Sequence, residues 1–206
     1  MPDKFNSSLD SVIPSEPPSP AIDGFDDMFD RIAAGLYSLA SMLVGEGEDG
    51  ARLVETAIAT TDISNSTHPA DTRQNSRRAL VAAAIELLEQ RDPYSFAAPD
   101  DLEPSLTCIE DDDLDTAGSY GDELERMISG PDRHRVRAWL ESLPTQTRTI
   151  FVLRAVAGFS ATETAALLAA HGGPRAAGWT PAAVSEFFRQ GLCSLASQLL
   201  QETAAK

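Results

Sequence analysis

The stretch LPTQTRTIFVLRAVAGFSATETAALL, residues 143–168, decides which fold this chain is expected to adopt. A helix is expected to end before Pro144, because proline lacks the amide that a helix interior requires. Gly158 then interrupts the apolar pattern that follows the proline. The stretch therefore predicts two short helices, at 145–157 and at 160–170.

Two further patterns mark helix starts in the same part of the chain. Ser160 followed by Glu163 predicts a capping box, in which the hydroxyl and the carboxylate each bond a backbone N–H group. Thr180 followed by Pro181 supplies a hydroxyl cap and a proline at the first helical position, and predicts a last helix that runs to about Gln201. On these features alone, the C-terminal part fits either a small packed bundle of helices or a helix-turn-helix.

Helical periodicity also dominates the rest of the chain. Apolar residues repeat at spacings of three and four from Phe25 to Leu43, and predict a helix from Asp23 to about Gly45. Further helices are predicted at 51–61, 77–91, 122–129 and 131–143. The sequence contains no strand alternation of useful length and no internal repeat, so the predicted fold class is all-α.

Composition divides the chain into four segments. Residues 1–22 are rich in Pro and Ser and predict a disordered tail, and the periodic residues 23–92 predict a first helical domain. Residues 93–121 lose the periodicity, contain the acidic run EDDDLD, and predict a linker. Residues 122–206 then form the second domain, which contains the helix-turn-helix pattern. We therefore expect two small helical domains that pack separately and are joined by an acidic linker.

The charge of the chain, −16 in total, is unevenly distributed. Residues 1–130 contain 8 basic and 27 acidic side chains, a balance of −19. Residues 131–206 contain 8 basic and 5 acidic side chains, a balance of +3. Because an acidic surface repels phosphate, any contact with nucleic acid is expected mainly from the C-terminal third.

Several classes of function have no support in the sequence. No apolar run is long enough to cross a membrane and the N-terminus lacks a signal-peptide pattern, so we expect a cytoplasmic protein without a membrane partner. Cys108 and Cys193 fit neither a disulfide framework nor a metal cluster and are expected to be inert thiols. The scattered histidines, His68, His134 and His171, and the acidic run without a calcium-loop glycine favour no metal site. We expect no cofactor and no enzymatic activity.

The spacing of residues in two places resembles a known protein family. The pattern LP-x(3)-R-x(2)-F-x-LR-x(3)-G-x-S-x(2)-E-x-A-x-LL over 143–168 is similar to region four of the extracytoplasmic-function class of RNA polymerase sigma factors. LYSLASMLVGEGEDGARLVETAI, at 36–58, is similar to region two of the same family. The resemblance implies a protein that binds the RNA polymerase core and assists promoter recognition, through region two on the polymerase clamp and region four on the upstream promoter element.

The resemblance also implies two sets of candidate contact residues. Those at region four would contact DNA: Arg148, Arg154, Ser160, Thr180, Ser185 and Arg189. Those at region two would contact the polymerase: Glu48, Asp49, Arg52, Leu53 and Glu55. An anti-sigma factor is a further candidate partner.

The chain departs from the family where DNA contacts are expected. In the last helix Arg189 is the only basic residue and Glu186 opposes it, while the usual basic positions hold Ser185, Phe187, Gln190, Leu192 and Cys193. The connection 171–179 exceeds the roughly three or four residues of a helix-turn-helix turn. The region-two motif DLVQET is replaced by RLVETA, and the helix at 77–91 has no aromatic side chain to stack on a DNA strand. Promoter DNA is therefore expected to bind weakly, or only together with the polymerase.

Two hypotheses of function remain open. The first is a sigma-factor-like transcription protein, and the second is a protein-interaction module of the same fold that binds the polymerase or an anti-sigma factor without binding DNA. A continuous positive face over Arg148, Arg154 and Arg189 would favour the first, and an apolar groove there would favour the second. Phe187 and Phe188 point about 100° apart on a helix. One of them is therefore expected either to mark a partner surface or to be covered by the preceding connection.

Overall fold

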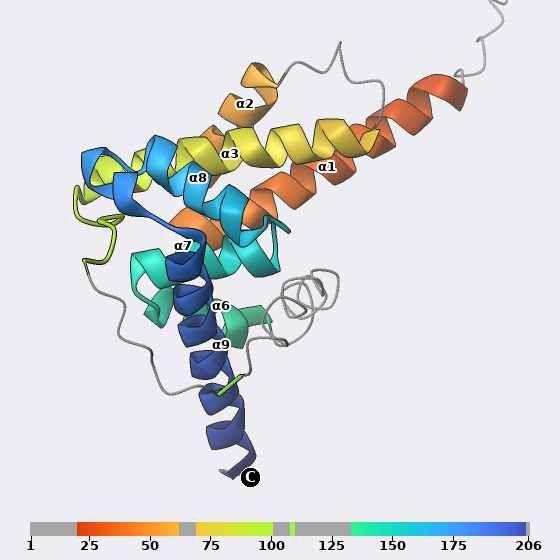
Figure 1. The fold of residues 1–206 in the computed structure, drawn as a ribbon. Coiled ribbons are helices and arrows are strands. Elements are labelled where there is room, and N and C mark those ends of the chain that lie inside the picture. Colours follow the sequence, from red (N-terminus) through yellow and green to blue (C-terminus); the bar gives the residue numbers. More distant parts are fainter. Residues whose placement is uncertain (1–19, 62–68, 101–107, 110–132, 205–206) are drawn as a thin grey trace, which may run out of the picture.

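The computed structural model describes residues 20–61, 69–100, 108–109 and 133–204. Within these residues every regular element is helical, so the predicted all-α class is confirmed. The N-terminal helices are α1 (Pro20–Val44), α2 (Glu48–Thr60) and α3 (Pro69–Arg91) (Figure 1). The C-terminal elements are α6 (Arg133–Ser142), α7 (Thr145–Ala155), α8 (Ala161–His171), the 3₁₀ helix η1 (Pro174–Gly178) and α9 (Pro181–Ala204).

The largest difference between a predicted and an observed helix boundary is at α3. This helix begins at Pro69, whereas the sequence predicts a start at residue 77. Its first residues, PADTRQNS, are nearly all polar, so they lack the apolar repeat from which a helix is predicted. The helix predicted at 122–129 lies outside the described residues, as does most of the tail predicted at 1–22.

The turn between α7 and α8 depends on a glycine and a capping box. Gly158 has a φ of 75°, a conformation that glycine adopts without steric cost. The N–H group of Phe159 donates to the carbonyl of Leu153 over 3.0 Å and closes the end of α7. The hydroxyl of Ser160 accepts from the amide of Glu163 at 3.1 Å, and the amide of Ser160 donates to the Glu163 carboxylate at 2.9 Å. The predicted capping box is therefore confirmed.

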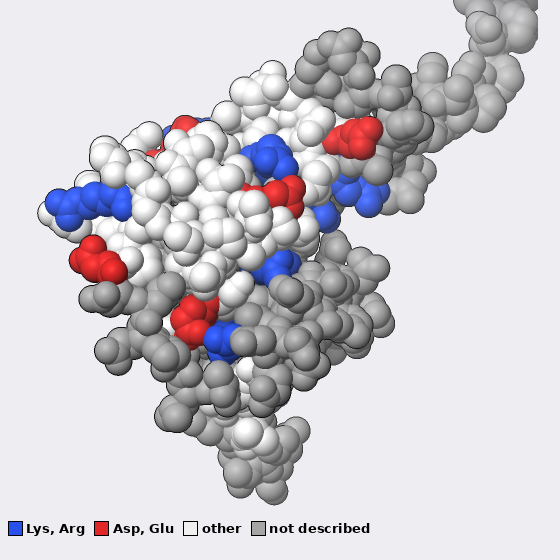
Figure 2. Space-filling view, viewed as in Figure 1, with Lys and Arg blue, Asp and Glu red and all other residues white. Residues whose placement is uncertain are grey.

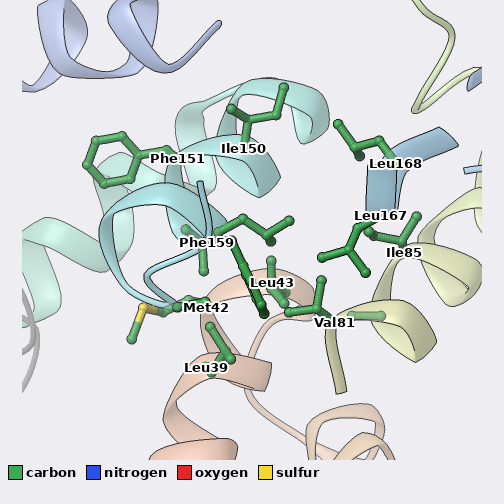
Figure 3. Packing of buried hydrophobic residues seen from close by; sticks show 14 of the residues in the cluster. Leu39, Met42, Leu43, Val81, Ile85, Ile150, Phe151, Phe159, Leu167 and Leu168 are labelled. Atoms are coloured by element: carbon green, nitrogen blue, oxygen red, sulfur yellow. The ribbon is translucent and has the colours of Figure 1, made fainter. Parts of the chain in front are cut away.

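The two halves of the chain share one hydrophobic core. Helices α1, α2 and α3 pack on one another, α7, α8 and α9 do the same, and α1 contacts α7 while α3 contacts α8. Figure 3 shows Leu43 of α1 and Ile85 of α3 in the same cluster as Phe159 and Leu167. The described helices thus form one packed unit, in contrast to the two separate lobes expected from the sequence. Periodicity identifies the apolar face of a helix but not the helix that covers it, and α8 packs against both α3 and α9.

The sequence predicts that residues 93–121 are an acidic linker, but residues 93–100 pack into the fold. Phe96 is fully buried, and its carbonyl accepts a hydrogen bond from the indole N–H of Trp179 at 2.9 Å. The amide of Ala98 donates to the carbonyl of Arg175 in η1, also at 2.9 Å. Both contacts join residues far apart in the sequence, so no local pattern marks them. This segment is therefore part of the C-terminal packing.

Cys108 and Cys193 form a disulfide bond, so the expectation that they are inert thiols is wrong. Their Cα atoms are 5.6 Å apart, within the ordinary range for a disulfide. Cys193 lies in α9 and is 85 residues from Cys108, and only the tertiary fold brings the two together. The acidic run at 110–115 and the remainder of the predicted linker lie outside the described residues.

None of the helices that the structure describes combines the length and the apolar character needed to cross a membrane. In the same residues, no group of three or more His, Cys, Asp or Glu side chains is arranged so that it could hold a metal ion. His68 lies outside this part of the chain.

Candidate functional site

Arg154, at the end of α7, makes its contacts inside the protein. Only 7% of the residue is exposed. Its Nη1 group donates to the carbonyl of Phe159 at 2.9 Å, and its guanidinium lies 5.2 Å from the ring centroid of Phe188 in α9. A buried guanidinium requires such partners, because burying an uncompensated charge is costly. Arg154 therefore holds the α7–α8 turn against α9, and in this arrangement it is not available to a DNA phosphate.

Arg189, the only basic residue of α9, is also buried, with 8% of its surface exposed. Its Nη1 atom lies 2.5 Å from Oε2 of Glu186, one turn earlier in the same helix. Glu186 is buried to the same degree, so the two opposite charges compensate each other inside the fold. Two of the three arginines on which a positive DNA-binding face would depend are therefore internal.

Arg148, the third of these arginines, lies half-buried on α7. Burial lowers the pKa of Arg148, and the nearby carboxylate of Glu141 partly offsets this effect. The side chain still carries its charge, because the ordinary pKa of arginine is far above neutral. One half-buried arginine does not make a continuous positive face.

The remaining DNA candidates are polar residues of helix starts and of α9. Ser160 caps α8, and the hydroxyl of Thr180 accepts from the amide of Ala183 at 3.1 Å and caps α9. Ser185 lies half-buried in α9. The two caps satisfy amides that a helix start leaves without partners, so they have a structural role that requires no DNA.

Phe187 and Phe188 differ in burial, as their positions on a helix predict. Phe188 is fully buried, and its ring centroid lies 5.7 Å from that of Phe151. Phe187 is half-buried, and its ring centroid lies 5.1 Å from that of Trp179, the residue that ends the 171–179 connection. The structure thus favours the interpretation in which this connection folds back, and it does so over Phe187.

Among the described residues, the side that Figure 2 shows has no continuous basic face. This side is largely uncharged, and its basic side chains are isolated, several of them next to acidic ones.

Other arginines of the C-terminal half also contact residues of the N-terminal half. Arg137 pairs with Glu46, and the guanidinium of Arg175 lies 4.1 Å from the ring centroid of Tyr94. Several of the arginines that give the C-terminal third its positive charge therefore make contacts within the fold.

The candidate polymerase contacts lie together on α2. Glu48, Arg52 and Glu55 are exposed, whereas Leu53 is buried in the core. Arg52 donates to Glu48 across 2.6 Å, and this hydrogen bond raises the pKa of Arg52. Asp49 pairs with Arg91 at the end of α3. Unlike the arginines of α7 and α9, most of these charged groups are accessible to a partner.

An open groove runs between α2 and α3, and three of the five polymerase candidates line it. We call it the α2–α3 groove, lined by Asp49, Arg52, Leu53, Thr56, Ala83, Glu86, Leu87 and Gln90. Its lining combines apolar side chains with a rim that carries both signs of charge. A protein surface with complementary charges suits such a rim better than a uniformly negative phosphate backbone does.

Among the described residues, three side chain–side chain hydrogen bonds join the two halves of the chain, and sequence reasoning missed all three. These contacts join Arg78 to Glu163, Glu86 to His171, and Glu46 to Arg137. The first two measure 2.9 Å and 2.7 Å and connect α3 with α8. No signal in a single sequence marks such pairs, because 85 residues or more separate the partners.

In comparisons with known proteins, no protein family, curated protein or solved structure matches this chain. Any statement of function therefore depends on the residues and geometry described above.

Proposed function

We propose that this chain is a sigma-factor-like transcription protein that binds the RNA polymerase core through the α2–α3 groove and does not bind DNA on its own. The observation that carries this proposal is the contrast between its two candidate surfaces. Arg154 and Arg189 are buried in contacts within the fold, whereas Glu48, Arg52 and Glu55 of α2 are exposed. The resemblance of 36–58 and 143–168 to sigma regions two and four supplies the family of the partner.

The charge of the chain supports the absence of independent DNA binding. A protein gains most of its affinity for DNA by neutralising phosphates with exposed Lys and Arg side chains. This chain carries a net charge of −16, and α9 offers one arginine that is already paired with Glu186. Any contribution to promoter recognition would then depend on the basic surfaces of the polymerase.

The rim of the α2–α3 groove supports a protein partner with basic residues. The carboxylates of Asp49 and Glu86 line the groove together with Arg52, and Glu48 and Glu55 are exposed on the same helix, α2. Charge complementarity across an interface speeds association and excludes partners of the same sign. The apolar part of the lining, from Leu53 and Leu87, offers a surface for an apolar side chain of the partner.

Binding to purified RNA polymerase core, measured by fluorescence anisotropy of the labelled full chain, tests the proposal. Glu55→Lys reverses an exposed charge on α2, and we expect it to weaken binding about tenfold or more. Glu141→Lys makes the same change at an exposed position of α6, away from the groove, and we expect a change of about twofold or less. Absence of binding by the wild-type chain, or equal effects of the two variants, would contradict the proposal.

A salt titration on duplex promoter DNA tests the second part of the proposal. The chain alone is expected to bind DNA weakly or not at all at physiological salt, and to be recruited to DNA only when core enzyme is present. Tight and sequence-specific binding by the chain alone at moderate salt would restore the interpretation of an ordinary sigma factor.

A further inference from the structure

The disulfide between Cys108 and Cys193 lies near the surface of the fold. Cys108 is exposed and Cys193 is half-buried on α9, so the disulfide lies at the surface rather than inside the helical core. The chain contains no other cysteine, so no other disulfide pairing within one chain competes with this one. Exposed disulfides of this kind are more readily reduced than those buried in a core.

The segment that leads toward Cys108 has a separate attachment to the fold. The carbonyl of Phe96 accepts from Trp179, and the amide of Ala98 donates to the carbonyl of Arg175, each at 2.9 Å. Neither hydrogen bond involves residues 108–109. The disulfide is therefore a second attachment, further along the chain, and the first remains when the disulfide opens.

The neighbours of Cys193 are also held independently of the disulfide. Trp139 donates its indole N–H to the hydroxyl of Ser194 at 3.0 Å, which fixes α6 against α9. Leu192, before Cys193, and Leu195, after it, both pack against the shared core. Opening the disulfide therefore leaves the position of α9 defined by packing.

We propose that Cys108 and Cys193 form a reversible thiol–disulfide site that a dithiol opens, so that residue 108 detaches from α9 while the helical core stays folded. One thiolate of the dithiol attacks the sulfur of Cys108, and the S–S bond breaks with its electron pair on the sulfur of Cys193, which takes a proton from solvent. The second thiolate of the dithiol then attacks the first sulfur of the same dithiol, which is bonded to Cys108 in the mixed disulfide. This step releases the thiolate of Cys108, which is also protonated by solvent. Two electrons pass to the protein, and the dithiol becomes a disulfide.

A reversible role, rather than a permanent crosslink, follows from the compartment in which a polymerase-binding protein works. Disulfides in reducing compartments are mostly transient, and they act in catalysis or redox sensing. This step of the argument rests on the proposed function; the exposure of Cys108 and the separate attachment at Phe96 do not. Cys193 lies on α9, the helix that resembles the recognition helix. The redox state of the disulfide therefore decides whether residue 108 is covalently attached to that helix.

The test uses the full-length chain and dithiothreitol as the dithiol. Before treatment we expect no titratable thiol, and after treatment without denaturant we expect two thiols per chain and unchanged helical circular dichroism. Reduction in native buffer should be slower than in denaturant by about tenfold at most, whereas a disulfide that opens only on unfolding would be slower by orders of magnitude. Hydrogen exchange should stay slow at the Ala98 amide in both states, and reoxidation with a small disulfide should restore the starting state.

A variant with both Cys108→Ser and Cys193→Ser is the matched control. Dithiothreitol should change nothing in this variant, and its Ala98 amide should be protected as in the reduced wild type. Two free thiols in the untreated protein, a requirement for denaturant, or loss of helical signal on reduction would each overturn the proposal. None of these measurements involves RNA polymerase, so their outcome is independent of the binding experiment above.

Discussion

Arg78 of α3 donates a hydrogen bond to Glu163 in the first turn of α8 over 2.9 Å, although 85 residues separate them. The same guanidinium lies 5.6 Å from the ring centroid of Phe159, in the turn that precedes α8. Both members of the ion pair are substantially exposed, so the pair contributes at most about 1 kcal/mol to stability. The apolar core between α3 and α8, rather than this ion pair, therefore holds the two halves together.

The capping box gives a prediction about stability. Ser160→Ala removes the acceptor for the Glu163 amide, and we expect it to lower the free energy of unfolding by about 1 kcal/mol in a urea titration. Ser197→Ala is the control, because Ser197 is exposed and its hydroxyl donates within α9, to the carbonyl of Cys193. Its effect should stay within about 0.5 kcal/mol. Equal effects of the two substitutions would show that the cap does not stabilise α8.

Glu163 gives a prediction about pH. Hydrogen bonds from the backbone and then the side chain of Ser160, and after them Arg78, lower the pKa of Glu163 from its ordinary value of 4.5. A carboxyl with a lowered pKa in the folded state stabilises the protein above its unfolded pKa, and this contribution is lost as the pH falls through the folded pKa. The stability of the wild type should therefore decrease more steeply below about pH 4.5 than that of Glu163→Gln.

Arg78→Gln is the control for the pH prediction. Arg78 is a smaller cause of the lowered pKa than Ser160, so this variant should retain most of the pH dependence of the wild type. The measurement is a series of urea titrations between neutral pH and about pH 3, a range that spans the ordinary carboxyl pKa. Parallel curves for the wild type and Glu163→Gln would contradict the prediction.

Arg154 gives a prediction that separates a structural role from a DNA-binding one. Arg154→Ala removes the hydrogen bond to the Phe159 carbonyl and the contact with the Phe188 ring, and should lower the free energy of unfolding by about 2–4 kcal/mol. Arg175→Ala, at an exposed arginine that contacts Tyr94, should cost less than about 1 kcal/mol. An Arg154→Ala variant with the stability of the wild type would contradict the structural role and favour the DNA-binding interpretation of this residue.

The two adjacent phenylalanines of α9 should respond differently to the same substitution. Phe188→Ser introduces a hydroxyl and a cavity at a fully buried position and should cost about 3–5 kcal/mol. Phe187→Ser removes a half-buried ring that contacts Trp179 edge-on and should cost about 1–2 kcal/mol. Thermal unfolding of both variants measures the difference. Comparable losses at both positions would mean that the 171–179 connection buries Phe187 more completely than the structure indicates.

The sequence by itself determined the local features of this protein. The all-α class, the cap of α8 at Ser160 and the start of α9 after Thr180 follow from patterns that span three or four residues. The hydrogen bonds that define a helix and its first turn have this same range, so neighbouring residues are sufficient to predict them. The first turns of α3 are polar and lack an apolar repeat, so the predicted start of this helix was wrong.

The tertiary structure alone decided which polar groups are available to a partner. Arg154 and Arg189 are candidate DNA contacts from the sequence alone, yet Arg154 is covered by Phe188 of α9, and Arg189 is buried beside Glu186. The disulfide of Cys108 with Cys193 and the bond from Trp179 to Phe96 join positions more than 80 residues apart. Burial and long-range pairing depend on how the helices pack against one another, and a helix's own sequence specifies an apolar face without specifying what covers it.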